Sequence, residues 1–152
     1  MTASDRLREL GIELPSVVPP LASYVPAVRA GDLVFTSGQL PMVDGAMAHT
    51  GLVGAEVTPE QAQLLARTCA LNALAAIDAL VGVDSVVRVV KVVGFVASAA
   101  GFTGQPSVIN GASELLGEVF GDAGRHARSA VGVAALPLGA PVEVELVVQI
   151  TG

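Results

Sequence analysis

A helical pattern followed directly by a long β-branched segment constrains the fold of this chain more than any other feature. Thr58 and Gln61 can form a capping box around Pro59, which suits the first position of a helix. The segment that follows predicts a helix of about six turns that ends at Gly82. Its apolar residues recur on one stripe, formed by Leu65, Cys69, Ala73, Ala76 and Leu80. Residues 86–96 then predict a strand that is apolar on both faces and therefore covered on both sides.

Shorter patterns complete the order of elements. Two apolar segments around a turn predict a hairpin whose strands cover residues 24–28 and 33–37. Asp44-Gly45 marks a further turn, and residues 4–10 predict a short amphipathic helix that ends at Gly11. A second long helix is expected over residues 107–120, with a buried stripe formed by Val108, Ala112, Leu115, Leu116 and Val119. Two strands, one containing Arg128 and one containing Glu143, close the chain.

This order of elements predicts an α+β fold. We expect a mixed β-sheet with two long helices packed on one face, in a chain whose 152 residues form one domain. The second face of the sheet would carry apolar or small residues that nothing in the same chain covers. Another copy of the same sheet is the expected partner for that face.

The composition supports an oligomer and argues against a membrane span. Hydrophobic residues make up 52% of the chain and charged residues 14%, which is apolar for a soluble monomer of this size. No run of about 18 uncharged apolar residues appears, because Arg88 and Lys91 interrupt the most apolar segment. The polar N-terminus lacks the apolar segment of a signal peptide. We therefore expect a cytoplasmic protein that does not contact membranes.

Charge and residue types exclude several classes of site. The net charge of −6, without a cluster of basic and aromatic residues, disfavours nucleic-acid binding. The single cysteine rules out an internal disulfide and fits a reducing compartment. One cysteine and two isolated histidines give no metal-ligand spacing, so no metal site is expected.

Arg128 begins a strand face whose other residues have almost no side chain. With a period of two, it shares this face with Ala130, Gly132 and Ala134. The opposite face is expected to lie in the core and carries Ser129, Val131, Val133 and Ala135. Small residues beside a guanidinium leave a hollow in which it can bind a carboxylate through two parallel hydrogen bonds.

Two motifs lie on either side of the predicted helix, strand and helix. The first is Tyr24-Val25-Pro26 with Phe35-Thr36-Ser37-Gly38-Gln39-Leu40-Pro41. The second runs from Ala127-Arg128-Ser129 to Leu136-Pro137 and continues with Val142-Glu143-Val144-Glu145. Together they resemble the RidA family, also called YjgF, of enamine/imine deaminases. The resemblance implies a chorismate-mutase-like fold and a homotrimer around a central barrel of sheets, with sites at the subunit clefts. Residues 1–21 would be an N-terminal extension typical of a distinct subgroup, followed by the domain at 22–152.

The resemblance also implies a site. Arg128 matches the arginine that binds the substrate carboxylate, and Glu143 matches the glutamate that positions the attacking water. Many members carry a cysteine where this chain has Ala130, so thiol chemistry is ruled out at that position. No metal or organic cofactor is implied. The residues that would line the cleft are Tyr24, Ser37, Asn110 and the backbone of Ala130.

Simpler roles remain open for these residues. Arg128 would otherwise be a surface arginine or form a salt bridge between subunits of a trimer, and Glu143 would be a solvated carboxylate. Cys69 is expected to be an inert core residue. His49 and His126 are expected to be exposed, and the alternative for His126 is a place at the rim of the cleft. Tyr24 would otherwise be a packing residue, and Ser37 would only form a hydrogen bond with the backbone. Asn110 would be a residue of the first turn of its helix.

Three functions follow from the resemblance. The first is hydrolytic deamination of an amino-acid-derived imine, such as 2-aminoacrylate or 2-iminopropanoate, to a 2-oxo acid and ammonia. The second is a trimer that binds a 2-oxo acid or related carboxylate without turnover. The third, cleavage of RNA, is disfavoured by the acidic charge and the scarcity of aromatic residues.

Overall fold

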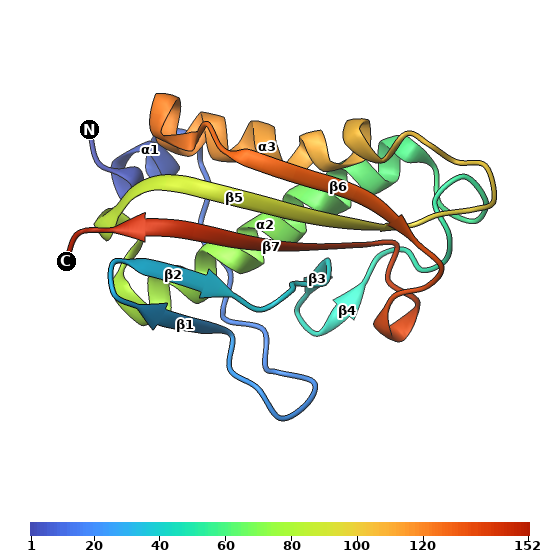
Figure 1. The fold of residues 1–152 in the computed structure, drawn as a ribbon, viewed down its shortest axis with the longest axis horizontal. Coiled ribbons are helices and arrows are strands. Elements are labelled where there is room, and N and C mark those ends of the chain that lie inside the picture. The colour runs from blue at the N-terminus through green and yellow to red at the C-terminus, as the bar shows by residue number, and fades with distance from the viewer.

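A five-stranded mixed sheet carries two helices on one of its faces (Figure 1). The computed structural model describes residues 1–152. The strand order is β1-β2-β7-β5-β6, and only β5 and β6 run parallel. The expected α+β fold is thereby confirmed. The strand bounds are β1 Ala27–Ala30, β2 Leu33–Thr36, β5 Val86–Ala97, β6 Ala127–Val133 and β7 Val142–Ile150.

Helix α2 (Pro59–Val81) begins and ends as predicted. The Thr58 hydroxyl accepts a hydrogen bond from the Gln61 amide, and the Gln61 side chain accepts one from the Thr58 amide. Gly82 ends the helix with a positive φ of 83°. The predicted stripe is buried except for Leu80, which is 46% exposed, because Ile77 takes the buried position near that end of the helix.

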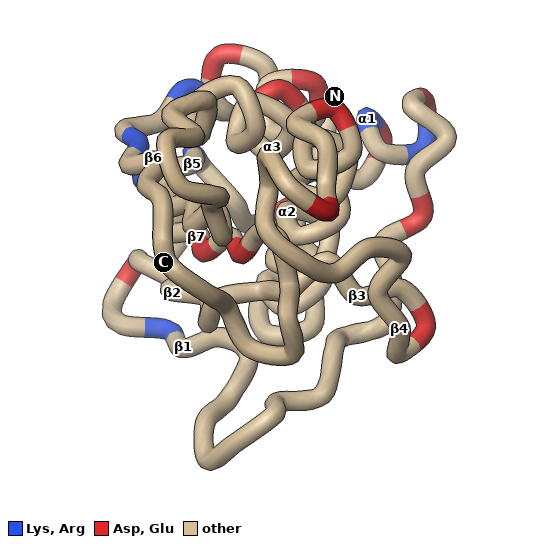
Figure 2. Tube along the Cα trace, turned by 90° about the vertical axis from the view of Figure 1, so that its right-hand side faces the viewer, with Lys and Arg blue, Asp and Glu red and all other residues tan.

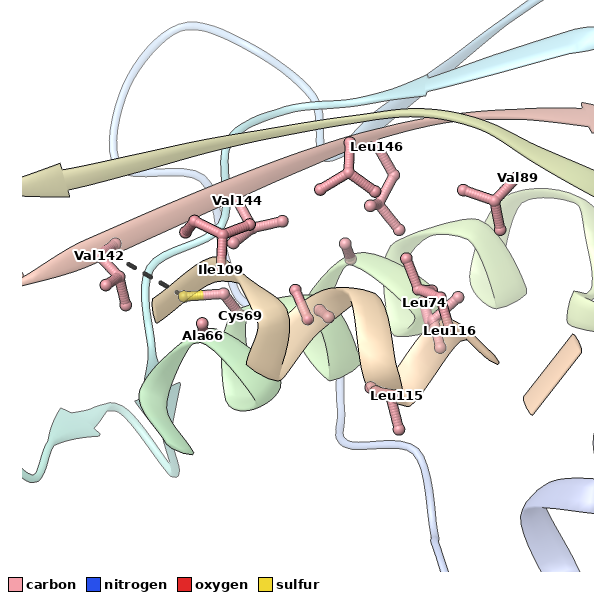
Figure 3. Close-up of a cluster of buried hydrophobic side chains, with 14 of the residues drawn as sticks. Ala66, Cys69, Leu74, Val89, Ile109, Leu115, Leu116, Val142, Val144 and Leu146 are labelled. Carbon is pink, nitrogen blue, oxygen red and sulfur yellow. Dashed lines mark hydrogen bonds between the residues drawn. The ribbon is translucent and has the colours of Figure 1, made fainter. Parts of the chain in front are cut away.

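Helix α3 (Gln105–Phe120) packs closely against α2, and its predicted stripe is buried. A Cβ atom on Gly111 would lie 1.9 Å from the carbonyl oxygen of Gln63, so a larger residue would push the two helices apart. Figure 3 shows the core side chains between these helices and the sheet. Helix α2 is long and apolar enough to cross a membrane, but 56% of its most apolar stretch is buried inside the protein, which makes it the core helix.

Helix α1 (Ala3–Glu9) ties the start of the chain to the body of the protein. Leu7 is buried in the core, and the Arg6 Nε donates to the Glu118 carbonyl at the end of α3. The Ser4 amide and hydroxyl both donate to the Asp84 carboxylate. The predicted helix over residues 4–10 is confirmed, and residues 12–26 follow it without helix or strand.

The first hairpin starts later than predicted. Strand β1 begins at Ala27 rather than Tyr24, because Pro26 has no amide hydrogen to donate to a neighbouring strand. Asp44 and Gly45 form a turn as expected. This turn joins two very short strands that the sequence did not predict, β3 (Met42–Val43) and β4 (Ala46–Met47).

The sheet face opposite the helices is uncovered within one chain. Register places Val28 beside Phe35, and it places Glu143, Phe95 and Val131 in one row. Val28, Phe35 and Val131 are each about half exposed (52%, 43% and 45%). Within one chain, strand β5 is covered on one side only, and the cover predicted for its other side stays a prediction. An exposed apolar face of this kind is typical of a surface that contacts another chain.

The two faces of β6 are the reverse of the prediction. Val131 was expected in the core but lies on the open face, whereas Arg128 lies on the helix side in register with the buried Val92. The pattern could not decide between the faces because both carry small residues. Helix α3 packs beside the face of Ala130 and Gly132, and the small size of these residues leaves room for the helix and for the long side chain of Arg128.

Candidate functional site

The Arg128 guanidinium is held by α3. Its Nη1 donates to the Asn110 side-chain oxygen at 2.8 Å and to the Ser113 hydroxyl at 3.2 Å. Its Nη2 donates to the Pro106 carbonyl oxygen at 3.3 Å. No carboxylate lies within ion-pair distance, so Arg128 forms no salt bridge within the chain, and the alternative of a salt bridge between subunits stays a prediction.

Two donors of this guanidinium have no acceptor in the chain. An arginine side chain has five N–H groups, and the contacts with α3 use three of them. The remaining Nε–H and Nη2–H are able to bind the two oxygens of one carboxylate in parallel. Arg128, Asn110 and Ser113 form what we call the arginine half-site.

Sequence reasoning predicted Asn110 but missed Ser113. Asn110 lies in the second turn of α3 rather than in its first turn. The missed signal was helical spacing, because residues three and four positions apart share one face of a helix. Pro106, Asn110 and Ser113 follow this spacing and all face Arg128, Pro106 through its backbone carbonyl and the other two through their polar side chains.

Glu143 lies on the other face of the sheet. Strand β7 alternates buried and partly buried residues, and Glu143 belongs to the partly buried set on the open face. Its carboxylate has no hydrogen-bond or ion-pair partner in the chain. Burial raises the pKa of the Glu143 carboxyl above its ordinary value, and the negative charge of Glu145 raises it further. A half-buried carboxylate without a partner is suited to accept a proton from water.

The main chain at Gly38 packs directly against this carboxylate. A Cβ atom on Gly38 would lie 2.7 Å from the Glu143 carboxyl carbon, so any side chain there would displace the carboxylate. Gln39 fixes this approach by exchanging two backbone hydrogen bonds with Val144. Gly38 of the first motif therefore helps to fix the position of Glu143 in the second motif.

Tyr24 and Ser37 belong to the same region. Tyr24 is 44% exposed and lines a small pocket together with Pro26, Gly38 and Gln39. The Ser37 hydroxyl donates to the Val25 carbonyl at 2.6 Å, which fixes the loop that carries Tyr24. The simpler role predicted for Ser37, backbone hydrogen bonding, is thus present. Tyr24, Gly38 and Glu143 form what we call the glutamate half-site.

The sheet separates the two half-sites. Arg128 is in register with Val92, whose side chain points to the helices, whereas Glu143 is in register with Phe95 on the open face. Figure 2 marks the acidic positions on β7 and the basic positions near the neighbouring strands β5 and β6. The two side chains therefore do not face one common pocket within a single chain.

The remaining predicted positions fall into place around these groups. Ala130 lies on the edge strand β6, where alternate backbone groups have no neighbouring strand to pair with.

Cys69 is fully buried, as predicted, and its thiol contacts the Val142 carbonyl (Figure 3). Burial raises the pKa of the Cys69 thiol well above its usual range, and the charge of Glu143 adds to the effect. This thiol is therefore unreactive.

A larger cavity, of about 560 Å³, lies beyond the loop that carries Tyr24. It is lined by the proline-rich segment at residues 15–20, the β3–β4 turn and one side of α2, and it contains neither Arg128 nor Glu143. Its charged lining residues are Glu13 and Asp44, both acidic. A carboxylate ligand is therefore better served by the arginine half-site.

Comparison with known proteins gives a family and several close relatives. The sequence profile of the family described as Endoribonuclease L-PSP matches residues 15–150. Protein TCP17 of Trypanosoma cruzi is 47% identical over 146 residues, which cover 95% of this chain and 91% of that protein.

Two solved structures share almost the whole chain. Protein Atu1372 of Agrobacterium tumefaciens is 47% identical with a TM-score of 0.88, covering 98% of this chain and 92% of that one. An endoribonuclease-like protein of Shewanella oneidensis MR-1 is 31% identical with a TM-score of 0.94, covering 99% and 100%. The N-terminal segment is thus shared with this group, because these matches include all but a few residues of the chain.

Proposed function

The chain belongs to the endoribonuclease L-PSP family, also known as YjgF/RidA, and on this premise we propose that it is a hydrolytic deaminase of 2-imino acids. The observation that carries the proposal is that one chain holds both a fixed guanidinium with two unused donors and a half-buried carboxylate that has no partner. The substrates are enamine/imine intermediates of the 2-aminoacrylate and 2-iminopropanoate type. The products are a 2-oxo acid and ammonia.

The arginine half-site binds and orients the substrate. The carboxylate of the imino acid accepts hydrogen bonds from the free Nε–H and Nη2–H of Arg128, while Asn110 and Ser113 hold the other side of the guanidinium. A bidentate contact fixes the plane of the carboxylate and therefore the direction in which the imine carbon points. Orientation of this kind removes much of the entropic cost of reaction.

The glutamate half-site supplies the water. Glu143 in its ionised form accepts a proton as the water oxygen bonds to the carbon of the protonated imine, which yields a neutral carbinolamine. Glu143 returns this proton to the nitrogen. The C–N bond then breaks and ammonia leaves, while the hydroxyl group gives its proton to Glu143 as the C=O bond of the 2-oxo acid forms. The imine is already reactive in water, so general base catalysis worth about 10²–10⁴-fold is sufficient. Every step uses side chains of the protein alone.

A homotrimer would bring the two half-sites together. Because the sheet separates them within one chain, the Arg128 of one copy must meet the Glu143 of another. The open apolar face that carries Val131 and Phe35 offers the contact surface, and burying it fits the high apolar content of the chain. A closed trimer with a central barrel of sheets would place one complete site at each of its three clefts.

The family description raises RNA cleavage as another activity. The net charge of −6 opposes it, because proteins that bind nucleic acid gain affinity from many lysine and arginine contacts with phosphates. The glutamate half-site also places Glu143 and Glu145 side by side on one face, which repels a polyanion. We therefore propose no nuclease activity.

Ammonia release tests deamination against simple binding. An amino-acid oxidase would generate 2-iminopropanoate from alanine, with and without the protein, and ammonia formation would be followed over time. Acceleration that saturates with imine concentration is the expected result. Thermal stabilisation by pyruvate without any acceleration would instead identify a non-catalytic binding protein.

A further inference from the structure

A chain of hydrogen bonds continues behind Arg128 to a histidine. His126 precedes β6 by one residue, and its ring is partly buried rather than exposed as expected from the sequence. Its Nδ1 lies 2.6 Å from the Gly124 carbonyl oxygen, and its Nε2 lies 2.8 Å from the Ser113 hydroxyl oxygen. The same hydroxyl accepts from Arg128 Nη1 at 3.2 Å. Gly124, His126, Ser113 and Arg128 are therefore connected in series.

The chemistry of the two ends sets the direction of two hydrogen bonds in this series. A carbonyl oxygen only accepts, so Nδ1 of His126 must carry a hydrogen for its contact with Gly124. A guanidinium only donates, so the Ser113 oxygen is an acceptor toward Arg128. The hydrogen of the Ser113 hydroxyl is then free to point to Nε2. In the neutral Nδ1–H form of His126, every donor in the series has an acceptor.

We infer that His126 and Ser113 are positioning residues that aim Arg128 at a substrate carboxylate, an inference that rests on the proposed function. The Nδ1–H tautomer makes Nε2 an acceptor and so orients the Ser113 hydroxyl. The oriented hydroxyl presents its lone pair to Nη1, which keeps that side of the guanidinium turned to α3. The Nε–H and second Nη2–H are thereby left on the side where a ligand can approach.

If Ser113 and His126 position Arg128, their replacement should affect charged and neutral ligands differently, whereas loss of a purely structural residue would affect both alike. Ser113 is partly buried and makes no ion pair, so its replacement removes one hydrogen bond to the guanidinium without creating a large cavity. Binding of a ligand that has a carboxylate should weaken. Binding of the matching neutral ligand should not change, because a ligand without a carboxylate does not depend on the orientation of the Arg128 guanidinium.

Binding measurements with 2-oxobutanoate and its neutral analogue 2-oxobutanamide test the inference. In Ser113→Ala and His126→Ala, we expect the affinity for 2-oxobutanoate to fall about tenfold and that for the amide to stay the same. Ser113→Thr retains the hydroxyl, and His126→Gln retains an acceptor near the position of Nε2, so both should stay within about threefold of wild type. Equal weakening for both ligands, or no weakening for either, would overturn the inference.

The imidazole tautomer gives a readout that is independent of any ligand. Nitrogen-15 NMR of the wild-type protein should show His126 with its proton on Nδ1 and an Nε2 that accepts a hydrogen bond, and Ser113→Ala should shift only the Nε2 signal. A proton on Nε2 in the wild type would overturn the inference while leaving the proposed function intact. A wild type that binds 2-oxobutanoate no better than the amide would overturn the proposed function itself.

Discussion

The arginine half-site and the glutamate half-site are built in opposite ways. The Arg128 guanidinium is paired on one side by three contacts from α3, so its direction is set before any ligand arrives. The Glu143 carboxylate has no partner at all, and it is confined by the main chain at Gly38 and by burial. A group that binds thus gains from fixed partners, whereas a group that exchanges a proton needs free oxygens and a raised pKa.

Removing the guanidinium that binds the substrate should lower the activity more than any other change to the two half-sites. Arg128→Ala deletes both free donors, and the account predicts a fall of about 10³-fold in kcat/KM for imine hydrolysis, because the substrate loses a bidentate charged contact. Arg125→Ala is the matched control, since Arg125 is 85% exposed and lies 3.8 Å from its nearest carboxylate, Asp122. Steady-state ammonia release measures both. Wild-type rates in Arg128→Ala would refute the assignment of this half-site.

Neutralising the proton acceptor, Glu143, should have the second-largest effect on activity. Glu143→Gln is expected to lower kcat by about 10²-fold, because the amide cannot accept the proton of the attacking water. In the wild type, the rate should rise with pH through a pKa above the ordinary value of 4.5, since the ionised form is the active one. Glu143→Gln should lose that rise. The pH profiles of kcat for the two proteins provide the measurement, and an unchanged profile would contradict a role for Glu143 as base.

A smaller effect is expected when Glu143 is displaced rather than removed. Gly38→Ala places a methyl group against the carboxyl carbon, so we expect a fall of about tenfold in kcat with a small change in KM. Gly117→Ala is the control, because Gly117 lies in α3 with open space around its Cβ position and should be neutral or slightly stabilising. Equal activity of the two variants would show that the position of Glu143 is not critical.

The smallest predicted effect concerns stability. The pKa of Glu143 is raised in the folded protein, so its ionisation is disfavoured there, and the free energy of unfolding falls as pH rises through that pKa. Glu143→Gln should therefore be more stable than wild type near neutral pH, by less than about 1 kcal/mol, and should lose this advantage below the ordinary glutamate pKa. Thermal unfolding at several pH values measures the difference. Lower stability of the variant at neutral pH would indicate that Glu143 has a stabilising partner.

Local sequence patterns predicted most of the helices and strands correctly. The capping box at Thr58, the stripe of α3 and the β-branched segment of β5 are each decided by neighbours in sequence, and the structure confirms them. The start of β1 was wrong by three residues because the missing amide of Pro26 was not weighed. The faces of β6 were reversed because Ala130 and Gly132 are too small to indicate which side a helix covers.

The site was only partly predictable. Motif resemblance predicted Arg128 and Glu143, but the sequence could not show that the sheet places them on opposite faces, because that depends on the strand order β7-β5-β6. Ser113 and His126 were not recognised as partners of Arg128, since their contacts form only when α3 packs beside β6. Contacts between distant segments of this kind depend on packing rather than on local pattern.

Complementation between two inactive variants tests most directly whether the half-sites join across subunits. Arg128→Ala and Glu143→Gln would each be purified, unfolded and refolded together in equal amounts, and imine hydrolysis would be compared with that of each variant refolded alone. If each site combines Arg128 of one copy with Glu143 of another, random mixing into trimers restores about a quarter of wild-type activity. Mixed trimers that remain as inactive as the separate variants would contradict the account.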